Sequence, residues 1–358
     1  MRRYAQVVSF GLYLHVPFCR HRCDYCAFAT WTDRHHLTDA YLGAVRTEIS
    51  RAVEAGMPPA TSVFVGGGTP TLVPPAALVE VLAAIPLAPG AEVTVESNPD
   101  DINDELVDTY LAGGVNRMSL GVQSMSPHVL GLLGRSHDPE NVVKAVSSFR
   151  RAGLPTFNLD LIYGSVGESL DQWRTTVLAA LELEPPHVSA YGLTVEAGTP
   201  LAADSARHPD DDDQADKYEV ADELLSAAGL ANYEISNWSL PAHECRHNVL
   251  YWAQGDYLGF GCAAHSHRAG RRWWNVRTPD RYIELVAAGE PTEAAAEVLD
   301  DETRRLEGLQ LALRTRDGVP ASALDVEALD GLVELDGSRV VLTRSGRLLA
   351  NELSVRLR

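Results

Sequence analysis

The chain has 358 residues, 45% of them hydrophobic and 7% aromatic, which is enough for one large α/β domain with a small appendage. Its formal net charge of −19 argues against nucleic acid or an anionic membrane as the main partner, because both require clustered Lys and Arg. No apolar run is long enough to span a bilayer, and the start, MRRYAQVVSFGLYLHV, lacks the features of a secretory signal. We therefore expect a cytoplasmic protein whose five cysteines include ligands or reactive thiols rather than a disulfide framework.

Residues 1–200 alternate short apolar runs with amphipathic segments. The apolar runs predict six strands, at 11–16, 62–65, 92–95, 115–120, 157–163 and 187–193. Near-continuous apolar strands separated by helical segments, such as TDAYLGAVRTEISRAVEAG, are typical of parallel βαβ units with right-handed crossovers. The predicted fold class is therefore α/β, a partial (β/α)6 barrel of the TIM type, and a doubly wound open sheet is the alternative.

Residues 201–277 form a second predicted region. Its acidic stretch ADSARHPDDDDQAD (203–216) is interpreted as a solvated linker or loop, and KYEVADELLSAAGL then predicts a helix. Residues 233–277 are rich in aromatic residues, His, Cys and Gly. Residues 278–358 predict a small, mainly helical domain with two β-like runs around DGSR, like the wing of a winged helix. Its charge does not favour DNA, so we expect a packing or lid domain.

Polar or Gly-rich segments accompany the ends of the predicted strands. The cysteines follow the first strand, GGGTP (66–70) the second, ESNP (96–99) the third and GVQS (121–124) the fourth. The fifth strand carries Asp160, and the sixth runs into YGLTVEAGTP. One such segment alone is most often a turn, but loops after parallel barrel strands converge on the face where barrel ligands bind. Together they predict a site on that face.

Three of the five cysteines, Cys19, Cys23 and Cys26, lie within HVPFCRHRCDYCAF (15–28). Their C-x3-C-x2-C spacing is too close for mutual disulfides and suits a metal centre. Tetrahedral zinc would require a fourth ligand. Three histidines could supply it: His15, His21 or His265. A four-iron cluster normally has one cysteine per iron, so three cysteines leave one iron open to a substrate or cofactor. The glycines of GGGTP would allow close backbone approach to a small zwitterionic ligand.

This cysteine spacing resembles the signature of the radical S-adenosylmethionine (SAM) enzymes. YLHVPFCRHRCDYCAF, GGGTPT, ESNPD, GVQS, LGRSH, NLDLIYG and EISNWS are together similar to the coproporphyrinogen oxidase-like branch, along nearly the whole chain. The resemblance implies that Cys19, Cys23 and Cys26 bind a [4Fe-4S] cluster whose fourth iron is chelated by SAM. It also implies that one electron from the cluster cleaves SAM to methionine and a 5′-deoxyadenosyl radical. The alternative is a zinc knuckle completed by a histidine.

The resemblance also implies which residues contact SAM. They are Tyr13, Tyr25, Gly67, Gly68, Thr69, Glu96, Gln123, Arg135, Asp160 and Gly192. Tyr13 would lie beside the bound cofactor, the Gly-Gly-Thr segment would cradle its methionine end, and Gly192 would line the adenine site. Tyr25 and some of the others contact a second SAM in the oxygen-independent oxidase. Without the resemblance, Arg135 would be a surface charge and Asp160 a buried strand-end group that needs partners.

Two departures separate this chain from the decarboxylating oxidase, which has C-x3-C-x2-C-x-C. Phe28 stands where that oxidase has its fourth cysteine, which disfavours coproporphyrinogen oxidation and favours the sister group, the radical SAM heme chaperones. HNVLYW (247–252) resembles the H-N-x-x-Y-W motif of that group, in which the His is implicated in heme binding. A neutral imidazole can ligate heme iron, and Tyr251 and Trp252 offer flat apolar surfaces to a macrocycle. His247 is therefore the expected heme ligand.

Other side chains compete with His247 for this role. The rival axial ligands are Cys245, Cys262, His265 and His267. Cys262 is more simply a small buried residue, and a lone His in an aromatic patch is more often structural.

The sequence predicts a heme chaperone that binds a [4Fe-4S] cluster and SAM and transfers heme to acceptor proteins, without coproporphyrinogen oxidase activity. An electron donor for the cluster and a cluster-dependent dimer are further expectations. The alternative is an oxygen-independent coproporphyrinogen III oxidase that uses the radical for oxidative decarboxylation. A plain iron–sulfur electron-transfer protein would leave GGGTP and the other segments of the binding face without a purpose.

Overall fold

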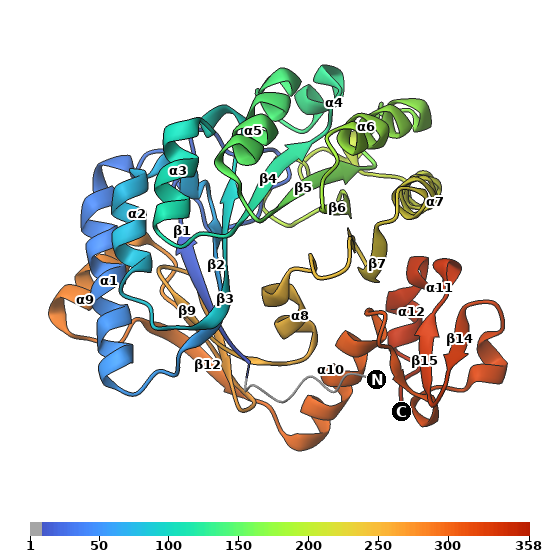
Figure 1. Ribbon diagram of the computed structural model, residues 1–358. Helices are drawn as coiled ribbons and strands as arrows, with labels where there is room; N and C mark the ends of the chain where they lie inside the picture. The colour runs from blue at the N-terminus through green and yellow to red at the C-terminus, as the bar shows by residue number, and fades with distance from the viewer. Residues whose placement is uncertain (1–8) are drawn as a thin grey trace.

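The structure, a computed structural model, describes residues 9–358 (Figure 1). The first eight residues of the start considered as a secretory signal lie outside this range. A twelve-stranded sheet has the order β12-β11-β10-β9-β1-β2-β3-β4-β5-β6-β8-β7. Its six central strands pair in parallel, each with the next along the chain. They are β1 (Phe10–Val16), β2 (Ala60–Gly67), β3 (Leu87–Ser97), β4 (Arg117–Gln123), β5 (Thr156–Tyr163) and β6 (His187–Gly192). All six overlap the predicted strands.

Helices cover the outer, convex side of this curved sheet (Figure 1). They are α1 (Thr38–Glu54), α2 (Pro75–Leu82), α3 (Asp104–Ala112), α4 (Pro127–Leu132), α5 (Pro139–Ala152) and α6 (Leu170–Glu182). Successive strand side chains point to opposite faces, so Leu12 and Leu14 of β1 are fully buried in the main core while Tyr13 faces the concave side. Because β6 pairs with β8 rather than with β1, the barrel stays open. The partial (β/α)6 barrel is thus confirmed.

Short strands that the sequence did not reveal extend both edges of the sheet. β7 (Ala231–Glu234) and β8 (Asn237–Ser239) lie beyond β6, and β9 (Asp256–Phe260) pairs in parallel with β1. Antiparallel strands β10 (His265–Arg268), β11 (Arg271–Asn275) and β12 (Glu293–Val298) complete the other edge. The helix α8 (Arg246–Trp252) lies on the concave side, against β1 and β2 (Figure 1).

The acidic stretch differs from its prediction. The helix α7 (Asp211–Ala227) begins inside it, and the Asp210 side chain accepts a hydrogen bond from the amide of Asp213 as an N-cap. Negative charge in the first turn of a helix is stabilised by the helix dipole, so a run of aspartates starts this helix rather than preventing it. Further along, the fully buried Lys217 pairs with Asp213 at 2.5 Å. The linker therefore ends at Asp210.

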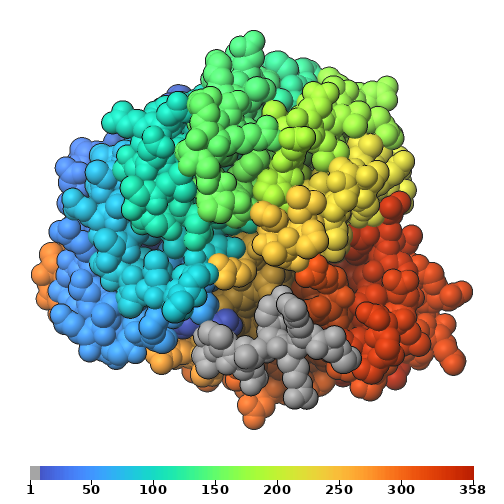
Figure 2. Space-filling view, in the orientation of Figure 1, coloured from blue at the N-terminus to red at the C-terminus, as the bar shows by residue number. Residues whose placement is uncertain are grey.

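The C-terminal part has its own hydrophobic core. It contains α10 (Asp301–Leu313), α11 (Arg344–Leu348), α12 (Ala350–Ser354) and a small sheet of β13 (Val319–Pro320), β15 (Arg339–Leu342) and β14 (Val333–Asp336). Asp222 of α7 anchors it by accepting hydrogen bonds from Arg344 and Arg347. Figure 2 shows this part, in red, directly against the larger body.

The helix α9 (Pro279–Ala288) and β12 follow residue 278 but pack with the large sheet, through core residues such as Tyr282. The second core therefore begins later along the chain, with α10, and the domain boundaries at 200 and 277 stay predictions. Within residues 9–358, no helix combines the length and apolar character needed to cross a membrane.

Candidate functional site

The loop that carries the three cysteines leaves the C-terminal end of β1 and closes on itself. The amide of Trp31 donates to the carbonyl of Pro17 at 2.8 Å, and the amide of Cys19 donates to the carbonyl of Trp31 at 3.1 Å. Cys19 is buried at the base of the loop, whereas Cys23 and Cys26 are half-buried. The fold thus places three thiols on the face where barrel ligands bind.

The three thiols are free and lie near one another. Burial raises the pKa of Cys19 to about 11, and the neighbouring charges of Cys26 and Cys23 add to this rise. Among residues 9–358, no three His, Cys, Asp or Glu side chains are grouped tightly enough for a single metal ion. In a [4Fe-4S] cluster each cysteine binds its own iron, so three soft thiolate donors on one loop would leave the fourth iron open.

Polar side chains from three neighbouring loops connect two of these sulfurs. The Thr69 hydroxyl donates to the sulfur of Cys19 at 3.7 Å, and the Arg135 guanidinium donates to the sulfur of Cys23 at 3.5 Å. Asn98 joins them, because its amide nitrogen donates to Thr69 Oγ1 at 3.3 Å and its oxygen accepts from Arg135 at 2.8 Å. Asn98 belongs to the ESNP segment, but the sequence alone predicted no role for it. Such outer contacts orient ligands and tune a metal centre.

The glycines of GGGTP pack against the end of β1. Gly67 has φ +107°, and a Cβ there would lie 2.3 Å from Nδ1 of His15. A Cβ on Gly68 would lie 2.6 Å from the carbonyl oxygen of Phe18. The missing side chains therefore let two adjacent strands approach, and this approach brings Thr69 to Cys19. Their contact with a cofactor stays a prediction.

His15 connects the inside of the barrel to the cysteine loop. One ring nitrogen is 3.0 Å from the Tyr13 hydroxyl and the other is 2.8 Å from the carbonyl of Ala29. Burial lowers the pKa of His15 to about 4. Because both nitrogens are occupied, His15 is not a free zinc ligand in this structure. Tyr13 lies on the concave side, stacked on Phe64.

Two acidic side chains of the predicted SAM site face the same concave space. Glu96 accepts a hydrogen bond from the amide of Gly67 at 3.1 Å, and burial, aided by the charge of Asp160, raises the pKa of Glu96 to about 8. Asp160 accepts hydrogen bonds of 2.7 Å from Ser119 and from Asn158. Burial raises the pKa of Asp160 as well. Ser119 and Asn158, which support Asp160, lie on the inner face of their strands. They were not predicted from the sequence, although their alternation with apolar residues could have indicated this inner face.

The remaining predicted SAM residues lie around this space. The Gln123 backbone has φ 61°, and its side chain lies over Gly121, 2.9 Å from where a Cβ would stand. Gly192 ends β6 beside Gln214 of α7. Tyr25 packs against a separate apolar cluster formed by Val129, Leu133, Ile162, Leu193 and Leu201. The structure therefore brings residues from all six parallel strands or the loops that follow them to one face.

His247, the expected heme ligand, is completely buried on the inner side of α8. Its Nδ1 is 3.0 Å from the hydroxyl of Ser62, and its Nε2 is 2.8 Å from the hydroxyl of Tyr251. The ring stacks on Phe64 at 5.6 Å and 25°, and burial lowers the pKa of His247 to about 3. The imidazole is thus neutral with both nitrogens bonded. It can ligate iron only after one of these bonds opens.

The rival ligands differ in access. Cys245 and Cys262 are buried, and burial raises the pKa of each thiol to about 12. His267 is buried with Nδ1 3.0 Å from the carbonyl of Gly255. His265 is exposed and stacks on Trp274 with ring centroids 5.6 Å apart. Among the four, only His265 is accessible without rearrangement.

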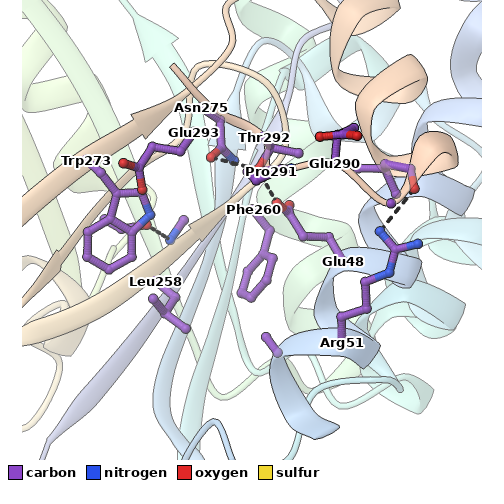
Figure 3. Close-up of a pocket in the computed structure, with 15 residues that line it drawn as sticks. Glu48, Arg51, Leu258, Phe260, Trp273, Asn275, Glu290, Pro291, Thr292 and Glu293 are labelled. Carbon is purple, nitrogen blue, oxygen red and sulfur yellow. Dashed lines mark hydrogen bonds between the residues drawn. The ribbon is translucent and has the colours of Figure 1, made fainter. Parts of the chain in front are cut away.

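A hollow of about 440 Å³ lies outside the barrel, between α1, α9 and the strands β9 to β12 (Figure 3). Glu48, Trp273 and Thr292 are among its lining residues, and the Thr292 hydroxyl donates to the Glu48 carboxylate at 2.5 Å. No predicted cofactor residue lines this hollow. It is therefore separate from the cysteine site.

The chain is similar to proteins from several bacteria that are named heme chaperone HemW. Identity to the protein of Mycobacterium tuberculosis (strain ATCC 25618 / H37Rv) is 42%, over 96% of this chain and 93% of the relative. The Bacillus subtilis (strain 168) protein is 34% identical, over 95% and 97%, and the Escherichia coli (strain K12) protein is 36% identical, over 83% of each.

Two further comparisons agree with this similarity. Residues 13–180 match the Radical SAM superfamily. The solved structure of coproporphyrinogen III oxidase (HemN) from Escherichia coli superposes with a TM-score of 0.85, covering 97% of this chain and 89% of that one. Its sequence is 23% identical, so this likeness shows the fold alone. With its cysteine loop and its similarity over nearly the whole length of the relatives, the chain belongs to the radical SAM superfamily and, within it, to the HemW heme chaperone family.

Proposed function

We propose that this protein is a heme chaperone that holds a [4Fe-4S] cluster and SAM at the C-terminal face of the barrel and transfers heme to acceptor proteins. The observation that carries the proposal is the similarity of nearly the whole chain to proteins with that name. The cysteine loop supports it further. Phe28 is 63% exposed where the decarboxylating oxidase has a fourth cysteine, so this position offers no thiol.

At the cofactor site, Cys19, Cys23 and Cys26 would hold the cluster, which supplies an open iron and an electron when bound. Thr69 and Arg135 donate hydrogen bonds toward the sulfurs, which stabilises their negative charge. The other predicted contacts of SAM are Tyr13, Tyr25, Gly67, Gly68, Glu96, Gln123, Asp160 and Gly192. The two acidic side chains in this set suit a cofactor that carries an ammonium and a sulfonium group.

His247 is the proposed heme ligand, and heme-acceptor proteins and an electron donor for the cluster are the proposed partners. A neutral, buried imidazole is the form that binds iron. The proposal includes a cluster-dependent dimer and a reducing compartment, the cytoplasm, where free thiols persist.

The test is an anaerobic titration of heme into the cluster-loaded protein, followed by its visible spectrum. We expect a Soret band that saturates at a fixed stoichiometry and is lost in His247→Ala. The matched control is His265→Ala, which removes an exposed histidine and is expected to leave the titration unchanged. Absence of a saturable Soret band in the wild type, or its retention in His247→Ala, would contradict the assignment.

A second assay separates this function from that of the oxidase. Anaerobic incubation with coproporphyrinogen III, SAM and a reductant is expected to leave the porphyrinogen unchanged. Formation of protoporphyrinogen would show that the chain is an oxidase despite Phe28.

A further inference from the structure

His247 is held between two hydroxyl groups from different parts of the fold. Ser62 belongs to β2 and is 1% exposed, and its hydroxyl lies 3.0 Å from Nδ1. Tyr251 lies one turn further along α8, and its hydroxyl lies 2.8 Å from Nε2. The two contacts together occupy every hydrogen-bonding position of the ring.

The backbone around His247 is held by close packing and by hydrogen bonds. A Cβ on Gly11 would lie 3.1 Å from the His247 ring and 3.0 Å from Leu250, so α8 packs closely on β1. The Glu92 carboxylate accepts hydrogen bonds from the amides of Arg246 and His247 at 3.1 and 3.2 Å. These contacts hold the helix in place. A change in the access of iron to the ring therefore needs a side chain to move rather than the helix.

The two hydroxyls differ in exposure, because Ser62 is fully buried whereas Tyr251 is half-buried. Ser62 is built into the central sheet, whereas Tyr251 is half-buried beside Tyr257, with ring centroids 4.6 Å apart. Burial first, and then the charge of Tyr257, raise the pKa of Tyr251 well above its ordinary value. Tyr251 therefore keeps its proton at neutral pH.

Resting on the proposed function, we infer that Ser62 and Tyr251 are positioning residues for the heme ligand: Ser62 orients His247 through Nδ1, and Tyr251 caps Nε2 until heme displaces it. With the proton on Nδ1, the imidazole donates to Ser62 Oγ and the Tyr251 phenol donates to the Nε2 lone pair. Metal-binding histidines usually donate their second N–H to a fixed acceptor, which sets the tautomer and the basicity of the ring. Heme binding then exchanges the Tyr251 hydrogen bond for an iron bond at the same nitrogen.

The decisive variant is Tyr251→Phe, measured by anaerobic heme titration. It leaves Nε2 unpaired, so heme no longer competes with a hydrogen bond. The net value of one such bond corresponds to a change of about 2- to 12-fold, and we expect tighter binding by that factor. Tyr257→Phe is the matched control, because it removes the same atom from the adjacent ring and is expected to leave the affinity unchanged. If Tyr251→Phe binds heme as the wild type does, or more weakly, the capping role is wrong.

Loss of the Ser62 hydroxyl is expected to weaken heme binding rather than to tighten it. We expect Ser62→Ala to bind heme roughly 10- to 100-fold more weakly, with a shifted Soret maximum, because the ring loses its fixed orientation. Ser62→Thr keeps a hydroxyl and is expected to restore the position of the Soret maximum. An unchanged affinity and spectrum in Ser62→Ala would overturn this role. If the wild type binds no heme, the proposed function fails instead, which distinguishes the two outcomes.

Discussion

The cysteine loop and the helix α8 both carry strong sequence motifs, but their candidate ligands differ in exposure and in hydrogen bonding. In the loop, Cys23 and Cys26 are half-buried thiols, and a donor from Arg135 points at the Cys23 sulfur. In α8, His247 is completely buried, and both of its ring nitrogens are bonded to other side chains. The loop therefore has partly exposed thiols that could bind a metal centre, whereas α8 has a buried imidazole with no free ring nitrogen.

This difference shows that a motif identifies the residues of a site without stating whether the site is open. Burial, and then the neighbouring charges of Cys26 and Cys23, raise the pKa of Cys19, so an iron cluster that neutralises the thiolate charge would stabilise the loop. His247 gains its stability from protein contacts instead. Loss of the cofactor should therefore affect the loop, and loss of a protein contact should affect α8.

The largest expected effect is the loss of the cluster in Cys23→Ser. A serine hydroxyl is a poor ligand for iron, so iron bound by anaerobically prepared protein should fall from about four per chain to near zero. Colorimetric iron and sulfide analysis measures this change. The control Cys262→Ala removes a buried thiol outside the loop and is expected to keep the cluster. Full iron content in Cys23→Ser would show that this loop does not hold the cluster.

The next effect concerns the stability of α8 in Glu92→Ala. This change leaves two amides of the helix without their acceptor and should lower the free energy of unfolding by about 2–3 kcal/mol. The midpoint of urea unfolding measures the loss. Glu92→Gln keeps an acceptor oxygen and should lose less. An unaltered midpoint in Glu92→Ala would show that α8 is not held by this carboxylate.

A smaller effect is the pH dependence of SAM binding through Glu96. Burial first, and the charge of Asp160 second, raise the pKa of Glu96 to about 8, so its carboxyl group holds a proton at neutral pH. A cationic cofactor favours the carboxylate and expels this proton. Affinity should therefore rise with pH up to about 8, by at most about tenfold per pH unit, and then level off. Calorimetry on the cluster-loaded protein at pH 6, 7 and 8 measures it. Glu96→Gln should flatten the profile, and a wild-type profile that is already flat would exclude this role.

The smallest effect is expected from Asn98→Ala, which breaks the connection between Thr69 and Arg135. Weaker hydrogen bonds to the sulfurs stabilise the reduced cluster less, so its reduction potential should become more negative by roughly 30–60 mV, or about 0.7–1.4 kcal/mol. A redox titration monitored by electron paramagnetic resonance measures the shift. Asn141→Ala, at an exposed contact with Asp100, is the control. A potential equal to that of the wild type would show that Asn98 only fills space.

The parts of the fold that follow from local pattern were predictable from sequence. The runs that contain Leu12 and Val63 form parallel strands because their apolar side chains pack under the outer helices. The edge strands β11 (RRWWN) and β7 (ANYE) were missed because short, mixed sequences become strands only where a sheet edge receives them. The aspartates at 211–213 were misinterpreted because acidic residues stabilise a helix when they lie in its first turn, and composition alone does not give that position.

The candidate site shows the same limit. The spacing of Cys19, Cys23 and Cys26 is local, so the sequence alone indicated a metal centre. The partners of His247 are not local, because Ser62 lies 185 residues away in the chain. Contacts over such distances depend on strand register, which no short motif encodes. For this reason the motif could predict a role for His247, but only the fold reveals that both of its ring nitrogens have hydrogen-bond partners.

The most informative single experiment combines anaerobic iron and sulfide analysis with visible spectra taken before and after heme is added. We expect about four irons and four sulfides per chain, a broad cluster absorption, and a saturable Soret band that leaves the cluster signal in place. Tightly bound zinc without sulfide, or a cluster-loaded protein whose spectrum heme does not change, would contradict the assignment as a cluster-bearing heme chaperone.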